Sequence, residues 1–394
     1  MVRFSFEDVI EHRLTPPTPP ADDDSRHNKI EEDNMHIQPQ PTIGRTLFER
    51  PNLGRARTAL SALTLCLGAF SITPSATAQN YDLTMAVITS PGDGYSILTA
   101  SVPERVAKAT GGKVKVTVSD SLVPPAQMAT AVREGRVDMS AALHTYLAAD
   151  EPRMGIFNLP GLINSIDEYK KVCDAFWCED TRGIWKEKWN AVVLAEGAWC
   201  TQNLFSKDPI RKVEDFKGKR LRVHNPQTAE VVNALGGKPV AMPTTEIFPA
   251  LERGVIDGLF ISTCVGGALE FWRIAKHVQN WELGPINGWA ILANPDSWNN
   301  LPEDVRKQVQ GAMDELQNEA FGNYDQFVGN AIRDMEKRGV TFWKAPPEER
   351  VKIQTAQYVG PAYAAWIKRA QQVGFDGTAY LDKVRKVLGK GALY

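Results

Sequence analysis

An internal repeat constrains the fold of this chain more than any other feature. Residues 81–142 are predicted to form strand, helix, strand, helix and strand, and residues 220–262 repeat that order. In both repeats a Gly-Gly-Lys triplet follows the first helix, at residues 111–113 and 236–238. Glycine ends a helix because it adopts the left-handed C-cap conformation without steric cost. The repeated order predicts two similar α/β lobes.

The segments that close the two repeats are also alike. Residues 131–138 are Ala-Val-Arg-Glu-Gly-Arg-Val-Asp and residues 250–257 are Ala-Leu-Glu-Arg-Gly-Val-Ile-Asp. Because Asp138 and Asp257 recur at equivalent strand positions, we expect them to bond turn amides rather than a ligand. Right-handed crossovers predict mostly parallel sheets, and ligands bind outside the carboxyl ends of such strands. Two facing lobes therefore predict a ligand cleft that closes about a hinge.

The last third of the chain is predicted to be mostly helical. Residues 302–337 carry one apolar face and begin with a proline and two carboxylates, as helix starts do. A helix of this length could brace both lobes. Residues 348–372 and 378–388 are predicted to form further helices. The predicted fold class is α/β, with two lobes, mostly parallel sheets, a ligand cleft between the lobes and a long bracing helix.

The first 78 residues are not expected to belong to this fold. Residues 1–44 are polar and proline-rich, so they bury too little apolar area to fold; they are either a disordered extension or lie upstream of a true start at Met35. Residues 45–78 are typical of a signal peptide, with four arginines, an apolar stretch and Ala-Thr-Ala at residues 76–78. We expect cleavage after Ala78 and export.

The positions of the cysteines help to predict the cellular compartment of the protein. Cys66 lies inside the apolar core of the signal peptide, behind Leu65 rather than a small residue, which argues against a lipoprotein. No later apolar run reaches the roughly 20 residues that span a bilayer, so we expect a soluble product without stable membrane insertion. Export implies an oxidising compartment. Cys173 and Cys178 could pair there if their segment is not a regular helix; buried free thiols are the alternative.

Charge and motifs argue against several classes of function. The formal net charge of -2 at pH 7 and the lack of a basic run after residue 80 argue against a nucleic-acid partner. Neither G-x-S-x-G nor H-E-x-x-H occurs, and His144, His224 and His277 are not spaced as metal ligands. We therefore expect no enzyme, no cofactor and no metal, although a catalytic triad can be dispersed in sequence.

Arg222 is the strongest binding candidate among the individual residues. It lies on the first strand of the second repeat, where a guanidinium could bind a carboxylate with two hydrogen bonds. The alternative is a surface arginine that continues the basic segment 217–220. His144 and Tyr146 follow the third strand of the first repeat, where cleft residues belong; a place in the core or at the rim is the alternative. The tryptophans are more typical of a core than of a ligand platform: Trp177, Trp185, Trp189 and Trp199.

The motifs of the second repeat are specific enough to indicate a family. They are Gly-Lys-Arg-Leu-Arg-Val at 218–223, Leu-Gly-Gly-Lys-Pro-Val-Ala-Met-Pro at 235–243, Glu-Ile-Phe-Pro-Ala-Leu at 246–251 and Gly-Val-Ile-Asp-Gly at 254–258. With them, and with Phe-Asn-Leu-Pro at 157–160, roughly residues 80–345 resemble the solute-binding component of TRAP (tripartite ATP-independent periplasmic) transporters, of the dicarboxylate-binding (DctP) type.

The resemblance implies a periplasmic receptor that delivers an organic acid to the membrane permease subunits of a TRAP transporter. It implies a fold like that of periplasmic binding proteins and, in our interpretation, a monomer. Lobe I is expected over residues 79–200, with residues 286–325 returning to it. Lobe II is expected over residues 201–285, with residues 326–394 as its helical C-terminal part.

The resemblance also implies roles for individual residues. Arg222 matches the arginine that pairs with the ligand carboxylate in this family, and Asn225 matches a frequent polar contact. Thr244 matches a position in the wall of the site. Tyr146 and Ala142 fall at contact positions of the first lobe. His144, Trp199 and Thr201 complete the predicted ligand-binding set.

Departures from the family pattern indicate the ligand. Thr201 stands where a second arginine is common, residues 259–261 are Leu-Phe-Ile in place of Gln-Glu-Asn, and residues 87–88 are Val-Ile at polar contact positions. Each change removes a charge or an amide, and unmade hydrogen bonds are costly. We therefore expect a monocarboxylate or 2-oxo acid with an apolar or aromatic body. A receptor for an ATP-driven importer, or a periplasmic hydrolase or redox enzyme, are the alternatives.

Overall fold

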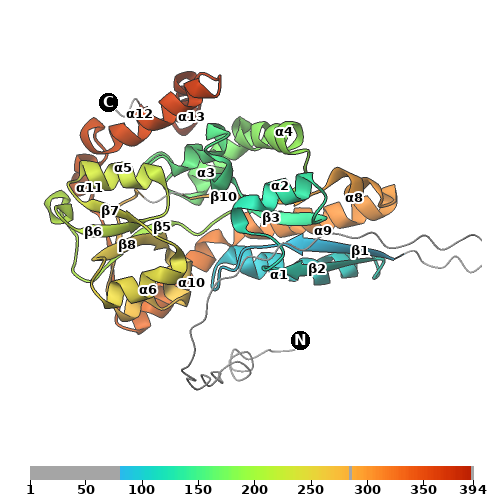
Figure 1. Cartoon of the computed structure of the whole chain (residues 1–394), viewed down its shortest axis with the longest axis horizontal. Coiled ribbons are helices and arrows are strands. Elements are labelled where there is room, and N and C mark those ends of the chain that lie inside the picture. The colour runs from blue at the N-terminus through green and yellow to red at the C-terminus, as the bar shows by residue number, and fades with distance from the viewer. Residues whose placement is uncertain (1–79, 284–285, 392–394) are drawn as a thin grey trace, which may run out of the picture. The chain divides into compact units, whose positions relative to one another are not determined.

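A computed structural model describes residues 80–283 and 286–391 of the chain (Figure 1). The extension and the signal peptide predicted over residues 1–78 lie outside the described residues. The strands are β1 (Tyr81–Ala86), β2 (Val114–Ser119), β3 (Met139–Leu143), β4 (Val192–Ala198), β5 (Gln202–Ser206), β6 (Arg220–Val223), β7 (Lys238–Ala241), β8 (Gly258–Ser262), β9 (His277–Asn280), β10 (Gly288–Ala293) and β11 (Thr341–Lys344).

Helices surround these strands. The α-helices are α1 (Gly94–Ala109), α2 (Met128–Arg133), α3 (Ile166–Val172), α4 (Cys178–Trp189), α5 (Pro226–Ala234), α6 (Thr244–Glu252), α7 (Thr263–Ala268), α8 (Pro295–Asn299), α9 (Glu303–Gly322), α10 (Tyr324–Lys337), α11 (Pro347–Ile353), α12 (Ala356–Gln372) and α13 (Gly377–Leu388). Short turns of 3₁₀-helix are η1 (Pro125–Gln127), η2 (His144–Leu147), η3 (Pro152–Asn158), η5 (Val213–Phe216) and η6 (Phe271–Arg273), and η4 (Cys173–Trp177) is a π-helical turn.

The strands of the described residues form two sheets, one in each lobe. The sheet of lobe I has the order β2-β1-β3-β10-β4, and the sheet of lobe II has the order β11-β9-β5-β8-β6-β7. Figure 1 shows the two sheets with helices on their faces. The predicted α/β fold with two lobes is confirmed.

Both sheets are mixed, and among the described residues five of the nine strand pairs are parallel and four are antiparallel. Within the repeats the pairs β1–β2, β1–β3, β6–β7 and β6–β8 are parallel, as the crossovers require. β10 comes from much later in the chain and lies antiparallel between β3 and β4. β5 pairs antiparallel with both β8 and β9. Strands that do not follow a right-handed crossover are free to pair in either direction, so the repeat could not predict them.

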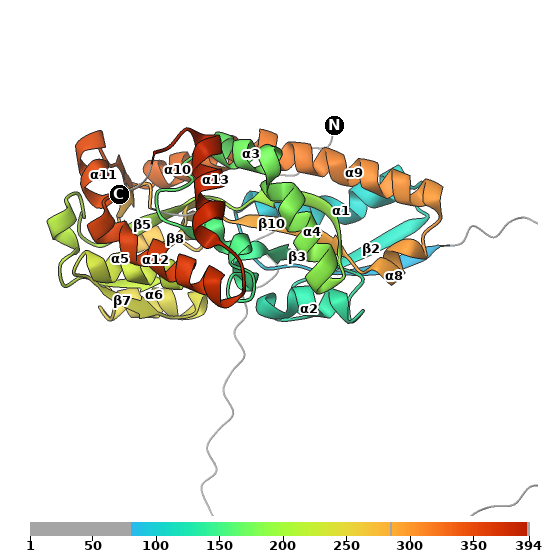
Figure 2. The same ribbon diagram turned by 90° about the horizontal axis from the view of Figure 1, so that it is seen from above.

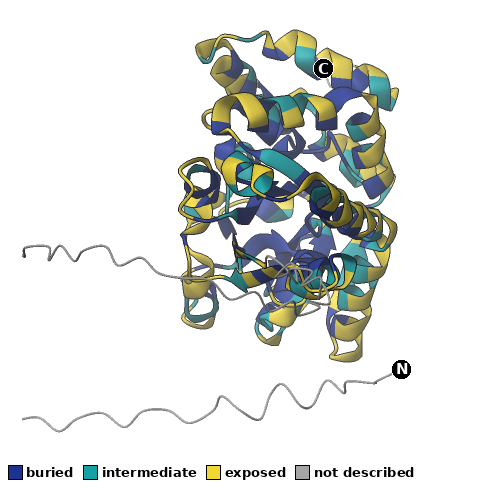
Figure 3. Cartoon of the chain, turned by 90° about the vertical axis from the view of Figure 1, so that its right-hand side faces the viewer, coloured by how far each residue is buried: buried dark blue, intermediate teal, exposed yellow. Residues whose placement is uncertain are grey.

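Alternate residues of the central strands enter different parts of the core. In β1, Met85 packs in the cluster that contains residues of α1 and α9, whereas Ala86 packs in the cluster that contains residues of α2 and α4. In β8, Phe260 packs in the cluster that contains residues of α5, whereas Ile261 packs in the cluster that contains residues of α6. Both sheets are therefore covered on both faces, as their nearly continuous apolar strands require. Figure 3 shows the buried residues on the inner sides of the elements.

The aspartates that close the two repeats have the predicted structural role. Asp138 accepts hydrogen bonds from the backbone N–H and the hydroxyl of Thr84, at 2.8 and 2.9 Å. Asp257 accepts from the backbone N–H of Arg220 at 2.8 Å and pairs with its guanidinium. Each aspartate thus ties the segment that closes its repeat to the first strand of that repeat, at the middle of β1 for Asp138 and at the start of β6 for Asp257.

The long helix predicted over residues 302–337 is in fact two helices. α9 ends at Gly322, and Asn323 has φ -101° and ψ 6°, outside the α-helical range. Glycine and asparagine are weak helix formers, and the packing partners change at this point. α9 contacts α1 and β4 of lobe I, whereas α10 contacts α7 of lobe II. Figure 2 shows α9 beside α1, with α10 continuing beyond its end.

The helix predicted over residues 348–372 is also divided, into α11 and α12. α12 contacts α5 of lobe II and the 3₁₀ turn η3 of lobe I. Arg369 of α12 donates to the carbonyl of Ala149 at 2.5 Å, and Trp366 donates to the carbonyl of Pro152 at 2.9 Å. α12 is therefore a second element that bridges both lobes.

The described part of the chain contains two disulfides. Cys173 pairs with Cys178 at the ends of the π-helical turn. An α-helix would place residues five apart on different faces, whereas the wider π turn brings their Cα atoms to 4.6 Å. The segment is thus not a regular helix, which was the condition for pairing. Cys200 pairs with Cys264, which is 64 residues later. Within the described residues, none of the helices has both the length and the hydropathy of a membrane span.

Candidate binding site

Arg222 lies in β6 with only 7% of its surface exposed. Its side chain is held by two backbone carbonyls. Nε donates to the carbonyl of Met242 at 3.2 Å, and Nη1 donates to the carbonyl of Phe260 at 3.1 Å. These bonds aim the guanidinium, which has five N–H donors, and leave Nη2 without a partner among the described residues. The arginine is therefore not the surface residue of the alternative interpretation.

The charge of Arg222 is buried without a compensating carboxylate among the described residues. Burial lowers the pKa of its guanidinium to about 10, and Tyr146, which would carry a negative charge only when ionised, acts in the opposite direction. A buried cation costs free energy unless an anion pairs with it. This arrangement suits the binding of an anionic ligand. Arg220, two residues earlier, contrasts with it because its guanidinium pairs with Asp257 at 2.7 Å.

A cavity of about 510 Å³ opens beside Arg222. It lies at the carboxyl end of β6, which is where an α/β sheet binds ligands. Apart from Arg222, His224 and Asn225, the side chains in its wall have no hydrogen-bond donor. The lining residues are Arg222, Val223, His224, Asn225, Pro226, Ala229, Ala241, Met242 and Pro243.

Asn225 connects the cavity to the start of α5. Its Oδ1 accepts a hydrogen bond from the N–H of Thr228 at 2.7 Å, so it is the N-cap of the helix. Its Nδ2 lies 2.8 Å from Nε2 of His224. Pro226 occupies the first helical position, where a missing N–H costs nothing. Asn225 therefore contributes both to the stability of α5 and to the cavity wall.

Tyr146 of lobe I faces a second cavity, of about 400 Å³. The side chain of Tyr146 is 44% exposed. Burial raises the pKa of its hydroxyl, and the positive charge of Arg222 acts in the opposite direction. The two side chains thus interact electrostatically across the two lobes. The lining residues of this second cavity are Thr145, Tyr146, Ala148, Ala149, Asn158, Asn225, Pro226, Gln227, Glu230, Ala365, Trp366 and Arg369.

The second cavity contains residues that sequence reasoning missed. Asn225 and Pro226 belong to the walls of both cavities. Ala365 and Trp366 come from α12, which follows the segment on which the family resemblance was based. Asn158 is 3% exposed, and its Oδ1 has no partner among the described residues. These residues could not be predicted from local sequence patterns, because such patterns do not show that α12 bridges the two lobes.

Five of the predicted residues lie outside the walls of both cavities, and His144, Ala142 and Thr244 are three of them. His144 is 1% exposed, and its ring packs against Trp177 and Trp185, at centroid distances of 5.1 and 5.7 Å. Ala142 is 4% exposed and packs in the core on the α2 and α4 side of the sheet. Thr244 is exposed at the start of α6, next to Pro243 of the cavity wall. Ligand contact by His144 and Ala142 stays a prediction, and in this structure both side chains are packed in the core.

Trp199 and Thr201 lie on the chain segment that crosses from β4 of lobe I to β5 of lobe II. Trp199 is 8% exposed, and its ring packs on Tyr95 with centroids 4.7 Å apart. The carbonyl of Thr201 accepts from the N–H of Thr263 at 2.9 Å and from its hydroxyl at 3.0 Å. Both residues therefore belong to the crossover and lie outside the cavity walls described above.

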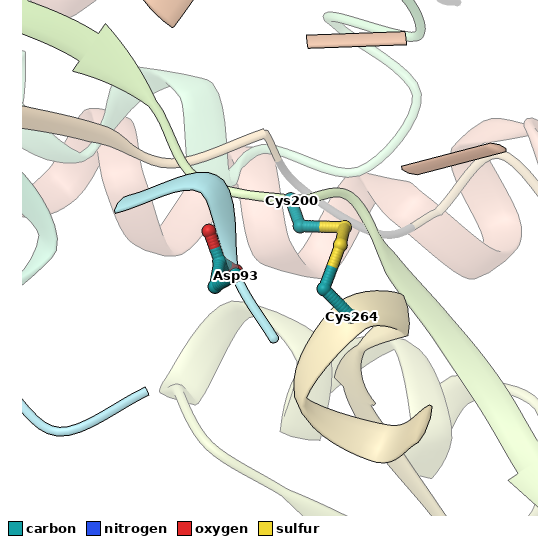
Figure 4. Close-up of side chains that lie close together, drawn as sticks. All are labelled: Asp93, Cys200 and Cys264. Carbon is teal, nitrogen blue, oxygen red and sulfur yellow. A yellow bond between two sulfur atoms is a disulfide. The ribbon is translucent and has the colours of Figure 1, made fainter. Parts of the chain in front are cut away.

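Asp93, Cys200 and Cys264 form a buried group beside this crossover (Figure 4). Their ligand atoms lie within 4.8 Å of one another, which would suit a metal ion if the cysteines were free. The two sulfurs are bonded to each other, so they are not thiolate ligands. The group is therefore a structural junction. Sequence reasoning missed it because its three members come from distant segments.

The chain resembles known proteins along most of its length. Residues 86–368 match the family described as bacterial extracellular solute-binding protein, family 7 (DctP). A solute-binding protein of Roseobacter denitrificans is 25% identical over 287 residues, which cover 72% of this chain and 87% of the relative. A monocarboxylate 2-oxoacid-binding periplasmic protein of a Nostoc species is 26% identical over 317 residues, which cover 78% of this chain and 85% of the relative.

Solved structures have the same fold. An extracytoplasmic solute receptor of Bordetella pertussis that binds pyroglutamic acid gives a TM-score of 0.69 at 21% identity, covering 77% of this chain and 99% of that receptor. A TRAP periplasmic solute-binding protein from Ralstonia eutropha with bound (S)-2-acetolactate gives 0.66 at 22% identity, covering 78% and 98%. These proteins are solute-binding receptors rather than enzymes. Because the family match extends over most of the chain, this protein belongs to the DctP family of extracellular solute-binding proteins, the solute receptors of TRAP transporters.

Proposed function

We propose that this protein is the periplasmic receptor of a TRAP transporter for a small acid with one carboxylate and an apolar or aromatic body. The observation that carries the proposal is the buried guanidinium of Arg222, which lacks a carboxylate partner among the described residues and lies in a cavity wall. A ligand carboxylate would supply the missing negative charge. Two charge-assisted hydrogen bonds at about 1.5–3 kcal/mol each would contribute most of the binding free energy.

The lining of the cavity beside Arg222 supports an apolar body. Its wall is formed largely by alanine, valine, proline and methionine side chains, whereas the adjoining cavity combines Trp366 and alanine methyl groups with polar side chains such as Asn158 and Gln227. Beside Arg222 a polyhydroxylated ligand would find few partners for its hydroxyls. The Nostoc relative is named for 2-oxo acids, and the Bordetella and Ralstonia receptors hold small carboxylates.

In this proposal the ligand binds between the lobes and draws them together. Lobe I comprises residues 79–200 with 286–325, and lobe II comprises residues 201–285 with 326–394. Tyr146 from lobe I and Arg222 from lobe II would contact the same solute. The closed receptor, a monomer released into the periplasm by cleavage after Ala78, would then deliver the solute to the membrane permease subunits.

The decisive experiment compares two arginines of the same strand. Arg222→Ala is expected to weaken binding of the preferred acid at least a hundredfold, because it removes the charge-assisted bonds. Arg220→Ala is the matched control, since its guanidinium pairs with Asp257 on the protein itself. Isothermal titration calorimetry on solute-free protein would measure both. Unchanged affinity in Arg222→Ala, with an intact circular dichroism spectrum, would refute the proposal.

The ligand class is tested with a panel of organic acids. Melting temperatures should rise with small monocarboxylates and 2-oxo acids, because a ligand that binds the folded state stabilises it. Selective stabilisation by a polyhydroxylated sugar acid would contradict the predicted apolar body.

A further inference from the structure

Within the described residues, the chain passes between the two sheets at three places, and all three adjoin Trp199. The passages run from β4 to β5, from β9 to β10 and, through α9 and α10, from β10 to β11. Trp199 directly follows β4, and its N–H donates to the carbonyl of Asn287, just before β10, at 2.6 Å. Its carbonyl accepts from the hydroxyl of Tyr324, at the start of α10, at 3.4 Å. Because atoms near a rotation axis move least, the lobes can turn about this point without breaking these contacts.

A Gly-Asp-Gly turn of lobe I, at residues 92–94, lies against lobe II beside this point. A Cβ atom on Gly92 would be 2.8 Å from the Cβ of Ala268 in α7. A Cβ atom on Gly94 would be 2.6 Å from the ring of Phe327 in α10. Because non-bonded carbon atoms rest about 3.5–4.0 Å apart, a side chain at either position would push the two lobes apart. Glycine is therefore required at both positions for this close approach.

Asp93 fastens the turn at its middle. It is 1% exposed, and its carboxylate accepts at 3.2 Å from the hydroxyl of Ser262, which caps α7. The Cys200–Cys264 disulfide joins the same helix to the crossover segment (Figure 4). On the lobe I side, Tyr95 packs its ring on Trp199 with centroids 4.7 Å apart. Separation of the turn from α7 would break a buried hydrogen bond, which is costly, so the turn, α7 and the crossover stay together when the lobes move.

The turn lies at the edge of each sheet where the proposed ligand contacts lie. Ser262 ends β8, and the carbonyl of Phe260 in the same strand accepts from Nη1 of Arg222 at 3.1 Å. In lobe I the turn follows β1, and Tyr146 follows the paired strand β3. The carboxyl ends of parallel strands share one edge of a sheet. A shift at the turn therefore changes how Arg222 and Tyr146 approach each other.

From these contacts we infer that Gly94 and Phe327 form the contact on which the lobes turn, and that glycine at position 94 sets how closely the lobes can approach. Both are positioning residues, since neither belongs to the wall of the two cavities described above. This inference rests on the proposed function, because it assumes that the lobes draw together around a solute. It adds the contact that fixes the geometry in which Tyr146 and Arg222 meet.

Gly94→Ala tests the inference by adding one methyl group at this contact. Isothermal titration calorimetry measures binding of pyruvate, 2-oxobutanoate and phenylpyruvate to protein freed of solute by unfolding and refolding. All three acids should bind about tenfold or more weakly than to the wild type and keep their order, because the overpacked contact acts on the lobes rather than on the ligand. Gly311→Ala is the matched control. Gly311 also lies in a helix, α9, but a Cβ atom there meets nothing within 4 Å, so the affinities should not change.

Phe327→Ala supplies the room that the added methyl group needs. In a Phe327→Ala background, the further change Gly94→Ala should alter the affinities by no more than about twofold, because the two atoms that collide are no longer both present. An equal loss of affinity in both backgrounds would overturn the inference, since the methyl group would then act through another neighbour.

A distance measurement separates a changed arrangement of the lobes from a loss of folding. Spin labels are attached to cysteines introduced at Gln127 and Glu246, which are both exposed. These residues lie four positions before the matching segments of the two repeats, 131–138 and 250–257, so they mark equivalent helices of the two lobes. Pulsed electron paramagnetic resonance should give a longer mean distance for Gly94→Ala than for the wild type, both without solute and with saturating acid. Melting curves check that each variant folds.

The contrary outcomes are distinct. Equal distances in the wild type and Gly94→Ala would overturn the inference even if binding became weaker. Failure of the proposed function has a different signature, namely that none of the three acids binds to the wild type, or that Arg222→Ala binds them as tightly as the wild type does. The distance measured on the solute-free protein then decides the inference by itself.

Discussion

The hydroxyl of Ser262, at the end of β8, donates a hydrogen bond to the carboxylate of Asp93, on the loop before α1, at 3.2 Å. This bond joins lobe II to lobe I at the point where the chain crosses between them. Asp93 also accepts from the N–H of Tyr95 at 3.1 Å and so caps α1, while Ser262 caps α7. The Cys200–Cys264 disulfide lies directly beside this pair (Figure 4). These contacts therefore hold the N-termini of α1 and α7 beside the segment that crosses between the two lobes.

Asp93 should make stability depend on pH. Burial raises the pKa of its carboxyl from 3.8 to about 6, against the opposing hydrogen bonds of its neighbours. Between these two values the folded state holds a proton that the unfolded state has lost, so the contribution of Asp93 to stability is present below about pH 4 and is lost as pH rises through 6. A pKa shift of about two units corresponds to roughly 3 kcal/mol in the free energy of unfolding.

Asp93→Asn should remove this dependence while keeping an acceptor for the cap. The difference in free energy of unfolding between variant and wild type should shift by about 3 kcal/mol in favour of the variant from pH 4 to pH 7. Urea unfolding across this range measures the shift. Parallel curves for the two proteins would show that the carboxyl has an ordinary pKa.

His144 should have the opposite effect. Burial lowers the pKa of its imidazole from 6.5 to about 3, so the unfolded state takes up a proton below pH 6.5 that the folded state does not. Stability therefore falls as pH drops from 6.5 to 3, by about 2 kcal/mol at pH 5. His144→Phe keeps an aromatic ring between Trp177 and Trp185, and its melting temperature should decrease less than that of the wild type from pH 7 to pH 5.

Phe157→Leu is the control for this measurement. Phe157 packs on Trp177 in the same cluster, with centroids 4.2 Å apart, but it does not titrate. The control should lower the melting temperature equally at both pH values. If His144→Phe behaves like the control, the buried histidine does not contribute to acid sensitivity.

The two disulfides should differ in their contribution to stability. Cys200–Cys264 closes a loop of sequence separation 64, and Cys173–Cys178 one of separation 5. Chain entropy predicts losses of about 4 and about 2 kcal/mol when the respective pairs are replaced by serines. Denaturant unfolding of the two double-serine variants checks this order, and a larger loss for the Cys173–Cys178 pair would show that the π-helical turn depends on its disulfide beyond chain entropy.

Two substitutions of Asn225 should separate its role in capping α5 from its predicted role in ligand binding. Asn225→Ala removes the N-cap of α5 and should cost about 1 kcal/mol of stability. Asn225→Asp keeps the cap acceptor, and so keeps stability, but places a negative charge beside Arg222. That charge should weaken carboxylate binding at least tenfold. Calorimetry and melting curves on both variants test the separation, which fails if Asn225→Asp binds the acid as tightly as the wild type.

Much of the parallel framework was predictable because it depends on neighbours in sequence. Glycine ends helices and apolar residues alternate in strands whatever lies elsewhere in the chain, so β1 to β3 and β6 to β8 were predicted in the right order. Arg222 was predictable for a similar reason, since the motif around it is continuous. The antiparallel strand β10 was not, because its position depends on partners about 150 residues away, such as Leu143 opposite Trp289.

The sequence by itself determined the two α/β repeats and the family, and it predicted the arginine that we propose as the partner of a ligand carboxylate. The tertiary structure decided where the long helix is interrupted and that Cys200 pairs with Cys264. It also placed His144 in the core and left Nδ1 of His224 without a partner among the described residues. The physical reason is the range of the interactions. Capping and periodicity act within a few residues, whereas burial, pairing and the shift of a pKa depend on groups that folding brings together from distant parts of the chain.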